Sequence, residues 1–172
     1  MRLYLRHSTK WQTILRALRH DSGYTIPNTD IIIKYHEYNE RIEVFKRGTT
    51  ESNRLTLMQL NISGTQWCCG VSQLGNFYEH STRADSELSN DVKQEILKII
   101  LSYAHNMYNK GVVQAWFYKT PRKDAYEHPN ILQLFTKNKF KKIGRASFNP
   151  NSGNTIQGYQ LTISRKPRNG NS

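Results

Sequence analysis

The segment Asn90–Met107 constrains the fold more than any other part of the sequence. Its apolar side chains recur at helical spacing, at Val92, Ile96, Ile99, Ile100, Tyr103 and Met107. Asp91 and Glu95 stand early in the segment, where negative charge complements the positive end of a helix dipole. The pattern predicts a long amphipathic helix, and the segments around it decide what this helix packs against.

Those neighbouring segments have the composition of β-strands. Val112–Tyr118, directly after the helix, is typical of a buried strand. Two hairpins are expected before the helix, Asp30–Tyr38 with Arg41–Lys46 and Leu55–Ile62 with Trp67–Leu74, turning at Asn39-Glu40 and Ser63-Gly64-Thr65. In Arg41–Lys46, Ile42 and Val44 share one face and Glu43 points away from it.

The first residues predict a short strand followed by a helix. Leu3 and Leu5 fall on one face of Met1–Arg6, as in a strand. One helical face follows at Trp11, Ile14, Leu15 and Leu18. Thr9 with Gln12 resembles a capping box at the start of this helix, and Gly23 is expected to end the segment.

The remaining chain predicts a short helix and a closing hairpin. Asn130–Asn138 carries one apolar face, and Lys141–Phe148 and Ile156–Ile163 flank a turn at residues 149–154. The expected fold is α/β (α+β), with a mixed, mostly antiparallel central sheet flanked by helices in three layers. One domain is expected over 1–163, followed by a mobile basic tail over 164–172.

Charge and composition exclude several classes of protein. Lys and Arg number 25 against 13 Asp and Glu, for a formal charge of +12, which favours partners that bear phosphates or other anionic groups. No stretch approaches the ~20 apolar residues of a membrane helix, and no apolar run follows Arg2 and Arg6 as in a secretory signal. Cys68 and Cys69 are adjacent in an expected strand, which favours two buried thiols over a disulfide or a nucleophile. We therefore predict a cytoplasmic protein.

This order of elements resembles the GNAT superfamily of N-acetyltransferases, which use acetyl-CoA. The most specific match runs from Ile131 to Gly144 and is similar to the family segment A-x-x-L-Y-x-K-x-G-F-x-x-x-G, with Leu134, Phe135, Lys137, Phe140 and Gly144 in its defined positions. The resemblance implies two parallel strands that splay apart around the pantetheine arm. It also implies pyrophosphate bound at the amino end of the long helix.

The resemblance implies transfer of an acetyl group to an amine of a protein or a small molecule. Glu79 or His80, after the central strand, would accept the amine proton. Phe135 stands where the family often has the tyrosine that protonates the thiolate, so Tyr126 or Tyr159 would supply this proton. The predicted acetyl-CoA-binding residues are Val71, Ser72, Leu74, Ser81, Thr82 and Arg83.

The distribution of charge indicates an alternative class, a binding protein without catalysis. Basic residues gather around the first helix, between Lys119 and Arg145, and in the tail, whereas acidic residues cluster between Glu79 and Glu95. Nucleic acid or an acidic protein would bind such a basic face. By analogy, phages and mobile elements encode small basic domains as virion or host-directed factors, in the virion or the host cytoplasm. The six histidines show no zinc-like spacing, so no metal site is predicted.

Overall fold

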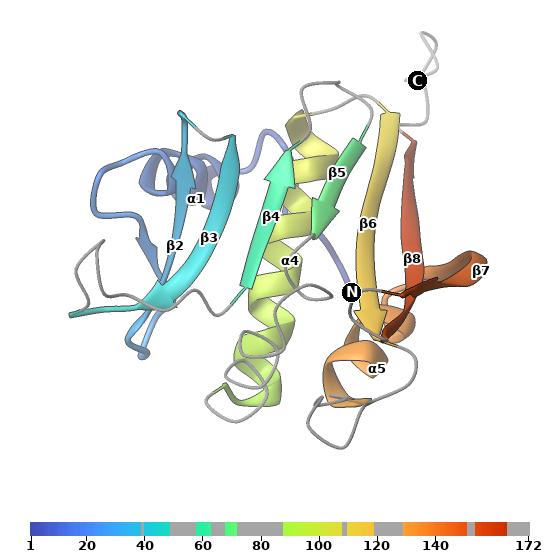
Figure 1. Cartoon of the computed structure of the whole chain (residues 1–172). Helices are drawn as coiled ribbons and strands as arrows, with labels where there is room; N and C mark the ends of the chain where they lie inside the picture. Colours follow the sequence, from blue (N-terminus) through green and yellow to red (C-terminus); the bar gives the residue numbers. More distant parts are fainter. Residues whose placement is uncertain are drawn as a thin grey trace, which may run out of the picture.

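One mixed β-sheet organises the chain. The computed structural model describes residues 1–38, 40–48, 58–62, 68–71, 88–107, 110–118, 129–150 and 154–164. Its strands form an eight-stranded sheet in the order β1-β2-β3-β4-β5-β6-β8-β7 (Figure 1). They are β1 Tyr24–Thr25, β2 Ile31–His36, β3 Arg41–Lys46, β4 Met58–Ile62, β5 Cys68–Val71, β6 Lys110–Tyr118, β7 Lys141–Asn149 and β8 Asn154–Ser164.

Strand direction divides this sheet into two parts. Strands β1 to β5 pair with their sequence neighbours in antiparallel register, and β8 pairs antiparallel with both β6 and β7. The two parts meet where β5 pairs with β6 in parallel. The structure therefore confirms the predicted mixed, mostly antiparallel sheet and the antiparallel pairing of the strands in both predicted hairpins, β2 with β3 and β4 with β5. Asn39 of the first predicted turn and the whole second turn, Ser63-Gly64-Thr65, lie outside the described residues.

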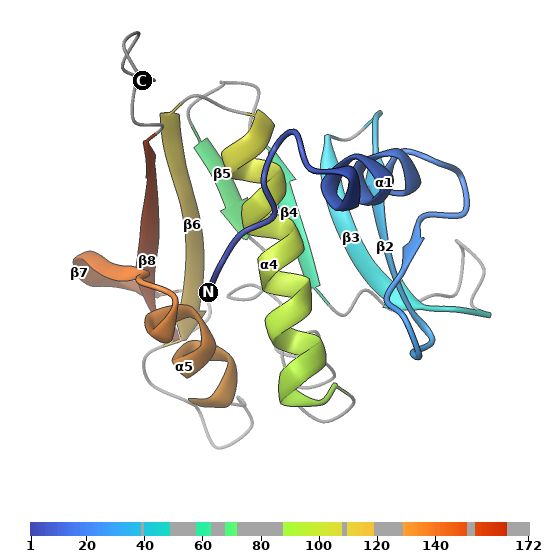
Figure 2. The ribbon, with the colours of Figure 1, turned by 180° about the vertical axis from the view of Figure 1, so that it is seen from behind.

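The described helices cover a single face of the sheet (Figure 2). They are α1 Thr9–Leu18, α4 Asn90–Met107 and α5 Pro129–Lys137. Side chains from all three helices join one buried cluster with the inward residues of the sheet, including Trp11, Ile96, Ile33 and Phe135. The described part of the molecule thus has two layers, where the element order led us to expect three.

Helix α1 begins one residue earlier than the predicted capping box. Ser8 is the N-cap, because its Oγ accepts a hydrogen bond from the Trp11 N–H at 3.1 Å. The Gln12 side chain instead donates to the carbonyl of Arg6. Gly23 lies in the turn that follows the helix, with a φ of +71°, and a Cβ there would lie 2.7 Å from Ile32 Cγ2. This turn therefore requires glycine.

The predicted strand over Met1–Arg6 is wrong. This segment lies along α4, and its backbone bonds to side chains of that helix rather than to another strand. The Tyr4 N–H donates to Ser102 Oγ at 2.9 Å, and Asn106 Nδ2 donates to the Tyr4 carbonyl at 2.9 Å. The Tyr4 hydroxyl donates to Glu95 Oε1, and burial, together with Glu95, raises its pKa above the usual range.

With this segment along it, ten of the eighteen residues of α4 are buried. Leu97 and Leu101, outside the predicted stripe, are buried, and so is the polar Ser102. Met107, which the stripe placed in the core, is 39% exposed. The N-terminal segment therefore completes a core that the sheet alone would leave open along this helix.

Candidate functional site

The parallel junction of the sheet is the geometry that the predicted cofactor site requires. Cys68–Val71 of β5 pairs with Val112–Ala115 of β6. Beyond Ala115, β6 continues to Tyr118 beside β8. Ligands of open α/β sheets bind outside the carboxyl ends of parallel strands. Val71, a predicted backbone contact of acetyl-CoA, is the last residue of β5 and lies at this junction.

The amino end of α4 lies at the same edge of the sheet. Figure 1 shows β5 and β6 ending toward the end of the molecule from which α4 starts. Backbone N–H groups and the helix dipole favour an anion there. Ser89 caps this end, since its Oγ accepts from the Val92 N–H at 3.3 Å. Asp91, exposed in the first turn, adds negative charge that opposes a phosphate.

Most of the predicted site residues lie outside the described part of the chain. These are the catalytic candidates Glu79, His80 and Tyr126 and the acetyl-CoA contacts Ser72, Leu74, Ser81, Thr82 and Arg83. The alternative acid Tyr159 is described. Register joins Val71 to Ala115 and Ala115 to Tyr159 in one row across the sheet, so the backbones of Val71 and Tyr159 are two strand spacings, about 10 Å, apart.

Phe135 has a structural role in the core. It is 0% exposed and packs edge-to-face against Phe140, with ring centroids 4.8 Å apart. A ring in this position contributes packing energy and has no proton to give to a thiolate. Because Phe135 cannot act as the acid, the tyrosines at positions 126 and 159 stay the predicted proton donors.

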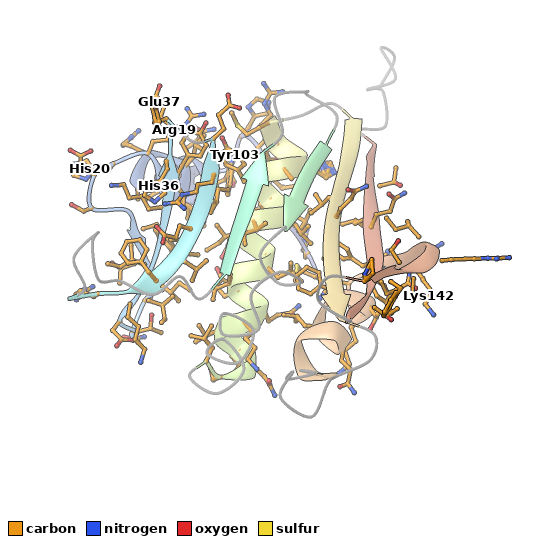
Figure 3. All side chains as sticks on the ribbon, in the orientation of Figure 1. Arg19, His20, His36, Glu37, Tyr103 and Lys142 are labelled. Atoms are coloured by element: carbon orange, nitrogen blue, oxygen red, sulfur yellow. The ribbon has the colours of Figure 1, made fainter. Side chains whose placement is uncertain are left out.

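A charged cluster that the sequence pattern did not identify lies on the opposite face of the sheet. Glu43 points away from the core, as expected, yet it is 2% exposed. His36 Nε2 lies 2.8 Å from Glu43 Oε1, and Arg41 Nη2 lies 3.8 Å from the same oxygen. Figure 3 shows His36 on its strand. A buried carboxylate between two basic groups can hold a proton or orient a cation.

Register relates this cluster to the parallel junction. Glu43 pairs with Gln59 of β4, and Asn61 of β4 pairs with Gly70 of β5. Since β4 and β5 are antiparallel, Gln59 lies nearer than Asn61 to the carboxyl end of β5. The Glu43 backbone therefore lies two strand spacings, about 10 Å, from β5, on the side toward the carboxyl end of that strand. The sequence pattern predicted the direction of Glu43 but not its burial, because burial depends on the folded chain.

Described residues also line two cavities that are remote from the junction. One of about 840 Å³ is lined by residues 1–8, His105 and Asn106. The other, of about 250 Å³, is lined by Arg6, Trp11, Gln12, Leu15, Asn106 and Met107. Both lie at the carboxyl end of α4, roughly 25 Å along the helix from its amino end. Neither one is the predicted acetyl-CoA site.

No group of three or more His, Cys, Asp or Glu side chains is placed to hold a metal ion in the part of the chain that the structure describes. Within the same ranges, no helix has the length and apolarity to cross a membrane. The cytoplasmic location stays a prediction.

The chain is distantly similar to a solved structure. No family model matches the chain, and no curated protein matches its sequence. A crystal structure described as "putative acetyltransferase from Sphaerobacter thermophilus DSM 20745" aligns with a TM-score of 0.41 and 8% identity, over 91% of this chain and 89% of the other. A similarity of this size carries no argument about function.

Proposed function

We propose that this protein is an N-acetyltransferase that binds acetyl-CoA at the junction of β5 and β6. One observation carries the proposal: the carboxyl ends of the parallel strands and the amino end of α4 lie at one edge of the sheet (Figure 1). Strand backbone can bind an extended amide-bearing arm, and helix amides can bind its phosphates. Asp91 is the described feature that opposes this fit.

The chemistry requires two proton transfers at this site, one to a base and one from an acid. An amine of a protein or small molecule attacks the thioester carbonyl, forming the C–N bond as the C–S bond breaks. The amine loses a proton to a base, for which Glu79 and His80 are the predicted groups, and the thiolate gains a proton from Tyr126. Each transfer contributes typically 10²–10⁴-fold, or about 3–5 kcal/mol, to the rate.

Tyr159 is the described alternative for the acid. It is one strand away from the β5–β6 junction, and it is partly buried against the core. Glu43, with His36 at 2.8 Å, lies on the opposite face of the sheet and four steps from β8 in the strand order. Glu43 and Tyr159 therefore cannot act as one acid–base pair.

Binding of acetyl-CoA is the decisive experiment. At about 100 times its dissociation constant a ligand stabilises the folded state by about 2.7 kcal/mol, which raises Tm by about 5–10 °C for a chain of this length. Arg83→Ala should weaken binding about tenfold through loss of a charge-assisted hydrogen bond. Arg145→Ala, an equal change of charge on β7, should leave affinity unchanged. Titration calorimetry and thermal unfolding that detect no acetyl-CoA effect at millimolar ligand would refute the proposal.

A further inference from the structure

The edge of the sheet formed by β7 is strongly basic. No Asp or Glu follows Glu127 in the sequence. Five cations lie between the end of α5 and the middle of β7, and all are exposed: Lys137, Lys139, Lys141, Lys142 and Arg145. In the described ranges, none of the recorded ion pairs involves any of these five. We call these residues, together with Phe148, the β7 surface.

The cations of the β7 surface lie on both faces of the strand and in the turn before it. Lys139 has a φ of +70° in the turn between α5 and β7. Register places Lys141 opposite Gln160 and Lys142 opposite Tyr159, so these two lysines lie on opposite faces of the strand. Figure 3 shows Lys142 beside β7 at this edge of the sheet. An elongated polyanion along this edge would therefore meet positive charge on both faces.

A bulge in β7 shapes the second half of the surface. The pairing with β8 shifts between Ile143 and Ser147. Gln157, which is 3% exposed, donates through Nε2 to the carbonyls of Ile143 and Gly158 at 3.0 and 3.1 Å. Bulges bend a strand and re-aim its side chains. Beyond the bulge, Phe148 is 64% exposed, an unusual environment for a large aromatic ring.

Protection of the edge explains only part of this pattern. Lysines on an edge strand discourage pairing with another chain. Lys141 and Lys142 would suffice for that purpose, and an exposed Phe148 works against it. A surface that combines clustered cations with an open aromatic ring matches the chemistry of single-stranded nucleic acid, whose phosphates pair with cations and whose bases stack on aromatic rings.

We propose that the β7 surface binds single-stranded nucleic acid, with phosphates along Lys137 to Arg145 and a base stacked on Phe148. An acidic protein would meet the charges but would gain no base stacking from the ring. This surface lies at the opposite end of the strand order from β1 and β2, which α1 contacts. Three exposed cations at this other end, Lys10 and Arg16 of α1 and its C-cap Arg19, therefore supply a control in which the same number of charges can be removed.

Fluorescence anisotropy with a labelled single-stranded oligonucleotide of about 15 nucleotides tests the proposal on the full chain. Five phosphate contacts give a slope of log K against log salt of about −3.5, or about a 100-fold loss of affinity between about 50 and 200 mM salt. The variant K139Q/K141Q/K142Q should lose more than about tenfold in affinity and reduce the slope by about 2. The α1 control K10Q/R16Q/R19Q should keep both values near wild type.

A second variant separates stacking from charge. Phe148→Ala should weaken binding about tenfold through loss of one stacked base, with the salt slope unchanged because no cation is removed. All the substituted side chains are exposed, so each variant should fold, and thermal unfolding checks this. Absence of binding at low salt, equal losses in the two triple variants, or an unchanged affinity in Phe148→Ala would each overturn the proposal. So would preferential binding of an acidic polypeptide over the oligonucleotide.

Discussion

Ser102→Ala should release the N-terminal segment from α4. Ser102 is 0% exposed, and its Oγ accepts the Tyr4 N–H at 2.9 Å. Removal of the acceptor leaves this amide unsatisfied, at a cost of about 1–3 kcal/mol. Alanine favours a helix interior over serine by about 0.5 kcal/mol, which offsets part of the loss. A net loss of about 1.5 kcal/mol lowers Tm by about 3–6 °C in a chain of this length.

Urea unfolding followed by circular dichroism measures this loss. Ser147→Ala on β7 is the matched control, because Ser147 is exposed and such changes stay within about 0.5 kcal/mol. Asn106→Ala removes the other hydrogen bond to the Tyr4 backbone, which Asn106 Nδ2 donates to the carbonyl. Since both side chains hold one residue, the double variant should lose less than the sum of the single losses. Additivity within about 0.5 kcal/mol would refute the view that these bonds anchor one segment.

Three further predictions concern other parts of the structure. Burial and Glu95 raise the pKa of Tyr4 and Tyr24 above 10.0, so the stability that they contribute is complete below about pH 10 and is lost as the pH rises and tyrosines of the unfolded chain ionise. The free energy of unfolding of Tyr4→Phe, measured in urea, should therefore fall less steeply with rising pH than that of the wild type. An unchanged dependence on pH would contradict this. Gln157→Leu leaves the carbonyls of Ile143 and Gly158 without this donor and should cost about 1–3 kcal/mol in urea unfolding, whereas wild-type stability would show that the amide is dispensable. Asp91→Asn should raise the affinity for acetyl-CoA about 2–5-fold, as measured by calorimetry. Weaker or equal binding would show that the phosphates do not bind at the amino end of α4.

Local sequence patterns correctly predicted the elements whose formation depends on neighbouring residues, such as α4. The bounds of α4 agree with the prediction because its apolar repeat extends over many turns. The predicted cap of α1 was one residue late, since Ser8 and Thr9 both carry a hydroxyl that can cap a helix. Long-range contacts explain the larger error at Met1–Arg6. The groups that bind Tyr4 are Ser102 and Asn106, nearly a hundred residues away, so no local pattern reveals them.

The candidate site was predictable in outline only. Element order placed the junction of two strands beside the long helix, and Val71 lies there. Sequence alternation also showed that Glu43 leaves the core face. What covers a side chain on the far face of a sheet depends on the whole fold, so the burial of Glu43 at 2% exposure could not follow from the pattern.

The junction of β5 and β6 also has a consequence for the order of folding. Strands β1 to β5 pair with sequence neighbours and can form as soon as they leave the ribosome. The β5–β6 pairing joins Val71 to Ala115, so it waits until α4 and β6 have been synthesised and the intervening loop has closed. Until then β5 presents an unpaired edge. The strand edge that is paired last is therefore the one at which the finished protein is proposed to hold acetyl-CoA.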